Sequence, residues 1–300
     1  MRCALLTPLL DGVAWIVARM PQRGVLALGR ALAWLGRPLL RSRRRIARVN
    51  IDLCFPELDA AARARLVDET VASTVIGAFE LIRAWHSPTR MLAPLATIEG
   101  LPLLRAALAR GGVLLFGGHM THTEITVRLI GDALGQPVHV VVRRHNDPCL
   151  EAWLVRSRRR AFGGTIGTKD MRALLRTLHD AQPVAYSADQ NFTYHHVFVP
   201  FFGVPAATMT AVPDIVARGR ATMLPFTARR DDRGRYHVRI GPEWAGWPSG
   251  DATRDAARYM TELEAAVREA PGQYLWVHQR FRTRPPGHPP VYGKSGTEQH

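Results

Sequence analysis

The hydrophobic pattern changes near residue 99, from long helical periodicity to short apolar runs that alternate with helices. GVLLFGG at 112–118 predicts a buried strand that ends in two glycines, and PVAYSAD at 183–189 predicts a strand that ends on polar residues. Other predicted strands are 137–143, 221–229, 235–241 and 274–278, and predicted helices are 59–86, 101–110, 121–134, 148–161, 169–181 and 251–270. Such alternation favours an α/β fold with a central mixed sheet flanked by helices.

Two apolar segments at the N-terminus, 4–18 and 24–40, are interrupted by Pro8 and Asp11 and by Arg30 and Arg37. Neither reaches the ~18 uninterrupted apolar residues that indicate a spanning helix. We expect a pair of helices lying in a membrane interface; two core helices of a soluble domain are the alternative. The predicted organisation is a membrane-associated segment at 1–40, an α/β domain at 41–292 and a flexible tail at 293–300.

The formal net charge of +15 indicates a polyanionic partner, which could be a nucleic acid, an anionic membrane surface or an acidic carrier protein. RSRRRIAR at 41–48 directly follows the apolar segments, as binding to anionic lipid requires. No nucleic-acid module or interleaved aromatic pattern accompanies the basic runs, so we expect no nucleic acid. Cys3, Cys54 and Cys149 are odd in number and widely spaced, which predicts independent thiols in a reducing compartment.

The strongest candidate chemistry lies in GGHMTHTE at 117–124. His119 falls in the turn after the buried strand and Glu124 in the next helix, at the strand end where α/β sites form. Residues five apart in an ideal helix are rotated by about 140°, but a ring in the preceding turn can swing back toward Glu124. The pattern predicts His119 as a general base whose imidazole Glu124 orients and stabilises when protonated.

Other interpretations of this segment remain open from spacing alone. A helix-capping histidine beside a surface glutamate would give the same pattern. A zinc site could use His119, His122 and Glu124, but the sequence has no HExxH motif and no cysteine pair. A serine hydrolase of the nucleophile-elbow type would need GxSxG, which is absent. We therefore expect no metal and no cofactor.

Five more segments accompany GGHMTHTE in a recognisable order. They are RRRIARVNIDLCFPEL (43–58), FELIRAW (79–85), VVRRHNDPCLEAW (141–153), ADQNFTYHHVFVPFFGVPAATMT (188–210) and YLWVHQRFRTRPPG (274–287). With them the chain resembles the late acyltransferases of lipid A biosynthesis, within the larger glycerolipid acyltransferase-like group. The resemblance covers about residues 40–292, and its most specific parts are FVPFFG and YLWVH. For FVPFFG we expect a structured loop beside an acyl groove.

The resemblance implies that residues 41–292 transfer a fatty acyl group from acyl carrier protein to a hydroxyl of a lipid A precursor, an anionic lipid. It also implies a place at the cytoplasmic face of the bacterial inner membrane. On the matching motif His119 is the general base and Glu124 its catalytic partner. Substrate-binding or oxyanion roles fall to Arg143 or Arg144, and to Asp189 and Gln190 on the family's Asp-Gln pair. Backbone amides after Gly118 are further candidates to stabilise an oxyanion.

The chain departs from the family where MTHT replaces a usually aromatic spacer between the catalytic pair. That departure leaves the acceptor open, and a lysophospholipid, a glycolipid or an aminolipid would use the same chemistry. Coenzyme A could replace acyl carrier protein as donor. The non-enzymatic alternative is a basic protein that binds membrane surfaces; an intact pair of His119 and Glu124 argues against it.

Overall fold

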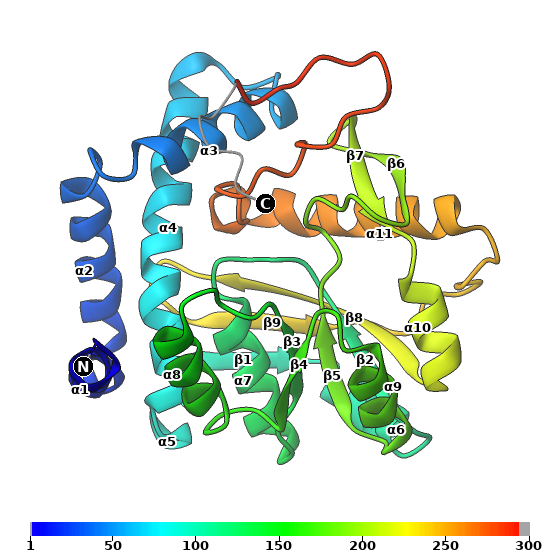
Figure 1. Cartoon of the computed structure of the whole chain (residues 1–300), viewed down its shortest axis with the longest axis horizontal. Helices are drawn as coiled ribbons and strands as arrows, with labels where there is room; N and C mark the ends of the chain where they lie inside the picture. Colours follow the sequence, from blue (N-terminus) through cyan, green and yellow to red (C-terminus); the bar gives the residue numbers. More distant parts are fainter. Residues whose placement is uncertain (1, 294–300) are drawn as a thin grey trace.

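A mixed sheet occupies the centre of the computed structural model, which describes residues 2–293 (Figure 1). Within these residues seven strands form it, in the order β1-β9-β8-β2-β5-β3-β4. Their bounds are β1 Ala96–Glu99, β2 Val113–Phe116, β3 His139–Val142, β4 Gly164–Gly167, β5 Pro183–Tyr186, β8 Thr222–Arg230 and β9 Tyr236–Ile240. All neighbours are parallel except β8 and β9, which are antiparallel. The predicted α/β fold with a central mixed sheet is therefore confirmed.

Helices flank this sheet and fill the N-terminal part of the chain. They are α1 Arg2–Arg19, α2 Gln22–Leu35, α3 Arg41–Cys54, α4 Ala60–His86, α5 Thr89–Leu92, α6 Leu101–Leu108, α7 Thr123–Leu134, α8 Pro148–Arg158, α9 Met171–His179, α10 Val212–Gly219 and α11 Ala252–Glu269, with short 3₁₀ turns η1 Ala93–Leu95 and η2 Pro271–Gln273. The long helix α4 begins where the sequence predicts, because the Asp59 side chain accepts a hydrogen bond from the Ala62 amide at 2.6 Å.

Strand β2 lies in the middle of the sheet and all four of its residues are buried. It pairs in parallel with β5 on one side and β8 on the other, in a register that aligns Phe116 with Tyr186. Chain segments that follow β2 and β5 therefore leave the same edge of the sheet side by side. This arrangement brings residues about 70 positions apart into one site, as described below.

Two expected features near the C-terminus differ from the structure. The segment expected as a loop contains strands β6 His196–Phe201 and β7 Val204–Met209, which form a separate antiparallel hairpin. Its two turn residues, Phe202 and Gly203, have φ values of 52° and 73°, as a tight hairpin turn requires. The expected strand 274–278 is also wrong: it makes a single bridge, between Tyr274 and Met120, and then turns.

The N-terminal helices pack against the α/β part of the chain. Helix α1 lies on α8, where Asp11 accepts hydrogen bonds from Trp153 Nε1 at 2.8 Å and from Arg156 at 3.0 Å. This contact brings Cys3 and Cys149 together as a disulfide with their Cα atoms 5.2 Å apart. The expectation of three independent thiols is thus wrong for this pair, because sequence spacing does not reveal that α1 folds back. Cys54 is a buried free thiol.

The outer faces of α1 and α2 carry exposed apolar side chains. Among the described helices, none combines the length and hydropathy needed to cross a bilayer. The exposed side chains include Leu5, Leu9, Trp15 and Ile16 on α1 and Leu32, Trp34 and Leu35 on α2. The membrane association expected for residues 1–40 stays a prediction, and residues 294–300 of the expected tail lie outside the described part of the chain.

Candidate active site

The turn after β2 carries the first predicted site residue. It passes so close to its neighbours that its two glycines leave no room for a side chain. A Cβ on Gly117 would lie 2.6 Å from the Phe226 ring, and one on Gly118 would lie 2.2 Å from Leu263. The glycines therefore allow the chain to turn sharply at the carboxyl end of β2 and present His119 at the sheet edge.

His119 is paired with Asp189, which follows β5. Its Nδ1 lies 2.5 Å from Asp189 Oδ1, and its backbone amide donates to Asp189 Oδ2 at 2.9 Å. Burial alone would lower the pKa of His119, but the charge and hydrogen bond of Asp189 raise it above the usual value of 6.5. For the Asp189 carboxyl, burial acts in the opposite direction and would raise the pKa, but the charge and hydrogen bonds of His119 lower it to about 2. Asp189 is thus ionised near neutral pH and fixes the imidazole by its Nδ1.

This pairing differs from two expectations. The resemblance assigns Asp189 to substrate or oxyanion binding, but its side chain is completely buried and both oxygens contact His119. The motif predicts that Glu124 orients the imidazole, but its carboxylate accepts a hydrogen bond from Trp85 Nε1 at 2.6 Å and from Arg158 Nη2 at 2.7 Å. The first turn of α7 directs Glu124 toward α4 and α8, away from the position that Asp189 occupies on the ring.

His119 and Glu124 nevertheless line one cavity of about 330 Å³. The same cavity is lined by Arg143 and Gln190, so the structure brings these two predicted residues to the site. Arg144 lines a neighbouring open groove along α8 instead. The cavity walls are otherwise largely apolar, with Val127, Val140, Val142, Phe192, Met209 and Phe226 among them. A base, a carboxylate and an arginine around an apolar hollow suit a reaction on a lipid-like substrate.

Comparison with known proteins agrees with this chemistry. The chain matches the bacterial lipid A biosynthesis acyltransferase family over residues 4–283. It belongs to this family. It is 32% identical over 286 residues to the lipid A biosynthesis palmitoleoyltransferase of Escherichia coli K12, covering 94% of this chain and 92% of that protein. Identity and coverage are the same for the lipid A biosynthesis lauroyltransferase of that strain. The lipid A biosynthesis myristoyltransferase of that strain is 25% identical, with coverages of 87% and 80%.

This acyltransferase therefore contains site residues that the sequence motifs alone do not distinguish. Arg158 and Trp85 hold Glu124. Arg158 lies in the predicted helix 148–161 and Trp85 in the segment FELIRAW (79–85), and neither segment suggests this contact. In the structure Arg158 is the only arginine of the run RSRRR (156–160) that is not exposed. Helical periodicity within that run could have separated it from its neighbours.

The backbone amides after Gly118 are not available to an oxyanion in this conformation of the acyltransferase. The His119 amide donates to Asp189 Oδ2 at 2.9 Å, and the Met120 amide donates to the Gly118 carbonyl at 3.0 Å. The expectation of an amide oxyanion hole at this turn is therefore not met. Arg143, which is exposed at the cavity, is left as the charged candidate for that role.

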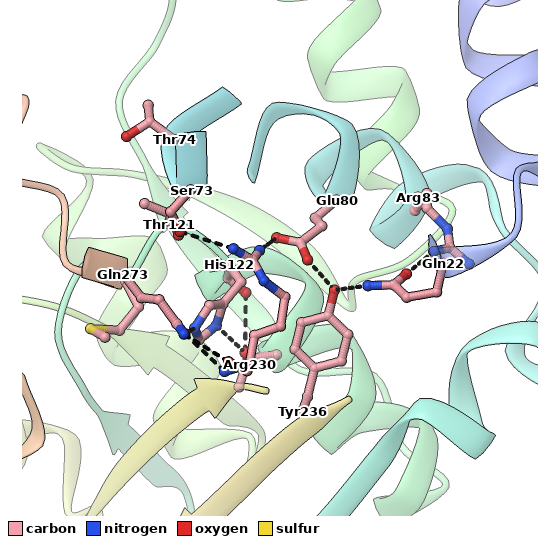
Figure 2. A network of polar contacts seen from close by, with 12 residues as sticks. Gln22, Ser73, Thr74, Glu80, Arg83, Thr121, His122, Arg230, Tyr236 and Gln273 are labelled. Atoms are coloured by element: carbon pink, nitrogen blue, oxygen red, sulfur yellow. Dashed lines mark hydrogen bonds and ion pairs between the residues drawn. The ribbon is translucent and has the colours of Figure 1, made fainter. Parts of the chain in front are cut away.

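A buried polar network in the acyltransferase includes His122, three residues after His119 (Figure 2). His122 is enclosed, with Nδ1 3.1 Å from Thr126 Oγ1 and Nε2 2.9 Å from Gln273 Oε1. Burial, with Arg230 nearby, lowers the pKa of His122 to about 4, so this histidine is neutral near neutral pH. Both ring nitrogens have partners, and the second histidine of GGHMTHTE therefore serves packing and hydrogen bonding.

Proposed function

We propose that this acyltransferase moves a fatty acyl chain from acyl carrier protein to a hydroxyl of a lipid A precursor, at the cytoplasmic face of the bacterial inner membrane. The family and its named relatives support a lipid A acyltransferase. The observation that carries the mechanism is the His119–Asp189 pair at the cavity, since it leaves Nε2 of the ring without a hydrogen-bond partner among the described residues.

In the proposed step, His119 Nε2 takes the proton of the acceptor hydroxyl as the hydroxyl oxygen bonds to the thioester carbonyl carbon. The carbon–sulfur bond then breaks, and the departing thiolate takes the proton back from the imidazolium. Asp189 holds the proton of Nδ1 and stabilises the positive ring between these two transfers. The products are the acylated lipid and the free thiol of the donor, and no acyl-enzyme forms.

Glu124 and Arg143 complete the proposed site. Glu124 lies at the cavity wall in an ion pair with Arg158 and a hydrogen bond with Trp85, where a second carboxylate favours the imidazolium from a greater distance. Arg143 faces the same cavity and would stabilise the negative oxygen that develops on the thioester carbonyl. Gln190 lines the cavity beside the Asp189 pair and would bind the acceptor.

The surroundings of the site support a membrane-bound lipid and an acidic donor. Exposed Trp15, Ile16 and Trp34, at 60%, 58% and 61%, would enter the interface of a bilayer, and the basic α3 follows directly. A net charge of +15 suits both anionic lipid and an acidic carrier protein.

The proposal is tested by offering the purified enzyme one acyl chain on two carriers, acyl carrier protein and coenzyme A. The candidate acceptors are a lipid A precursor, a lysophospholipid and a glycolipid, and products are identified by mass spectrometry. We expect acylation of the lipid A precursor, faster from the carrier protein. Acylation of lysophospholipid alone would refute the acceptor, and equal rates from both donors would refute the preference for the carrier protein.

A further inference from the structure

Helix α2 packs closely against α4 at Gly29, where only the Ile76 side chain of α4 lies between the two helices. A Cβ on Gly29 would lie 2.5 Å from Ile76 Cγ1 and 3.1 Å from Ile76 Cα. Val25 and Leu26 of the same helix are buried with Ile76 in a small apolar cluster. Ile76 thus fills the space beside Gly29, and α2 cannot move toward α4 or gain a side chain at position 29 without displacing one of the two helices.

The next residue of α4 makes an equally close contact with the catalytic turn. A Cβ on Gly77 would lie 2.3 Å from the carbonyl oxygen of Thr121, two residues after His119. One helical turn earlier, Ser73 Oγ lies 2.7 Å from Thr121 Oγ1. Consecutive residues of α4 therefore touch α2 on one side and the turn on the other, so a single layer of backbone separates the two.

A chain of buried polar contacts runs in parallel with this path (Figure 2). Gln22 at the start of α2 donates to the Tyr236 hydroxyl at 3.2 Å, and that hydroxyl donates to Glu80. Glu80 is fully buried and ion-paired with Arg230, whose Nη2 donates to Ser73 Oγ at 2.9 Å. Breaking a buried ion pair would leave an uncompensated charge in the interior, so these contacts hold α2, α4 and β8 in one arrangement.

We propose that α2 is a positioning element of the active site: its seat on α4 fixes the turn that presents His119. The proposal rests on the catalytic role of His119 given above. It gives α2 a role in positioning His119, besides the membrane contact proposed for its outer face. A shift of α2 away from α4 would relax the Thr121 contact and move the imidazole, and misplacement by an ångström can lower a rate ~10²-fold.

Gly29→Ala tests this, with Gly24→Ala as the matched control on the same helix. A Cβ on Gly24 meets only ordinary contacts, the nearest at 3.5 Å. Both substitutions raise helix propensity equally. We expect Gly29→Ala to lower kcat about tenfold while both KM values and liposome binding stay close to those of the control. The added methyl group overpacks a buried contact, so the thermal unfolding midpoint should fall by a few degrees, with the variant still folded at the assay temperature. A kcat equal to that of Gly24→Ala would overturn the proposal.

Ile76→Ala provides the rescue, because it removes the Cγ1 atom that the methyl group added by Gly29→Ala would meet. The double variant should recover most of the lost kcat. If Gly29→Ala does not fold, Ile76→Ala and the double variant are compared with each other. Refilling the contact with the added methyl group should raise kcat, and equal rates would overturn the proposal. His119→Ala is assayed alongside: its loss of activity establishes the role of His119 separately, whereas an active His119→Ala would refute the proposed function itself.

Discussion

Replacing Asp189 by Asn removes the charge that holds His119 while keeping an oxygen in place. The amide oxygen of Asn can accept from Nδ1–H, but its NH₂ group would face the His119 amide, which now donates to Asp189 Oδ2 at 2.9 Å. A hydrogen bond to a charged group is worth ~1.5–3 kcal/mol net. Since ~1.36 kcal/mol is a factor of ten, the alkaline plateau of kcat/KM should fall about 10- to 100-fold.

The pH dependence gives this prediction a sign. A general base must be neutral, so wild-type kcat/KM rises as pH increases through the pKa of His119, which lies above 6.5. Asn cannot supply the charge of Asp189, so burial, which lowers the pKa of His119, becomes the dominant influence on it. The acidic limb of kcat/KM should therefore move to lower pH in Asp189→Asn. The difference in kcat/KM between the variant and the wild type should be smaller at low pH than on the alkaline plateau.

The assay is transfer of a labelled acyl chain to lipid acceptor over a pH series. Asp189 has a pKa of about 2 in the folded protein, below the usual 3.8. Its stabilising contribution is therefore complete above the unfolded value and is lost only as pH falls through about 2. Asp255→Asn is the control, a buried carboxylate that accepts from the Ser249 amide. An unchanged plateau, or an acidic limb that moves to higher pH, would refute the role of Asp189.

Three further predictions follow from the site and its surroundings. Ser187→Ala should change turnover only a few-fold although Ser187 lines the cavity, and the intact mass of the wild-type enzyme should show no acyl adduct when donor is supplied without acceptor. Arg158→Met should lower kcat about tenfold or more because it leaves Glu124 with Trp85 alone. The control Arg156→Met removes an exposed ion pair with Asp11 and should have little effect on kcat. Equal effects of the two substitutions would contradict the role of Arg158. Trp15→Ser with Trp34→Ser should weaken binding to anionic liposomes in a sedimentation assay, whereas Leu103→Ser on α6 should not; unchanged binding would count against the interfacial helices.

Local signals in the sequence predict the strands and the turn that carry the site. GVLLFGG contains a continuous apolar run and two glycines, and both β2 and the turn before His119 follow from them. Asp189 is likewise predicted at the end of a strand. The missing information is that β2 and β5 are neighbours, with Phe116 beside Tyr186. His119 and Asp189 each lie three residues after these paired residues and therefore meet. That adjacency depends on the order of the strands in the sheet, which no single segment of the sequence determines.

Long-range contacts explain the other differences. Glu124 is held by Arg158, 34 residues away, so its spacing from His119 misleads about its partner. Cys3 and Cys149 meet only because α1 folds onto α8. The β6–β7 hairpin escapes prediction for a local reason, since Phe202 adopts a positive φ that favours glycine or asparagine in such turns.

The central claim is that His119 removes the proton of a lipid hydroxyl so that it attacks the acyl thioester directly. The most direct measurement is single-turnover transfer from acyl carrier protein to a lipid A precursor by wild type and His119→Ala, with circular dichroism showing that both are folded. General-base catalysis contributes typically ~10²–10⁴-fold, so the variant should lose at least about a hundredfold in rate. A folded His119→Ala enzyme that acylates the lipid at close to the wild-type rate would contradict the account.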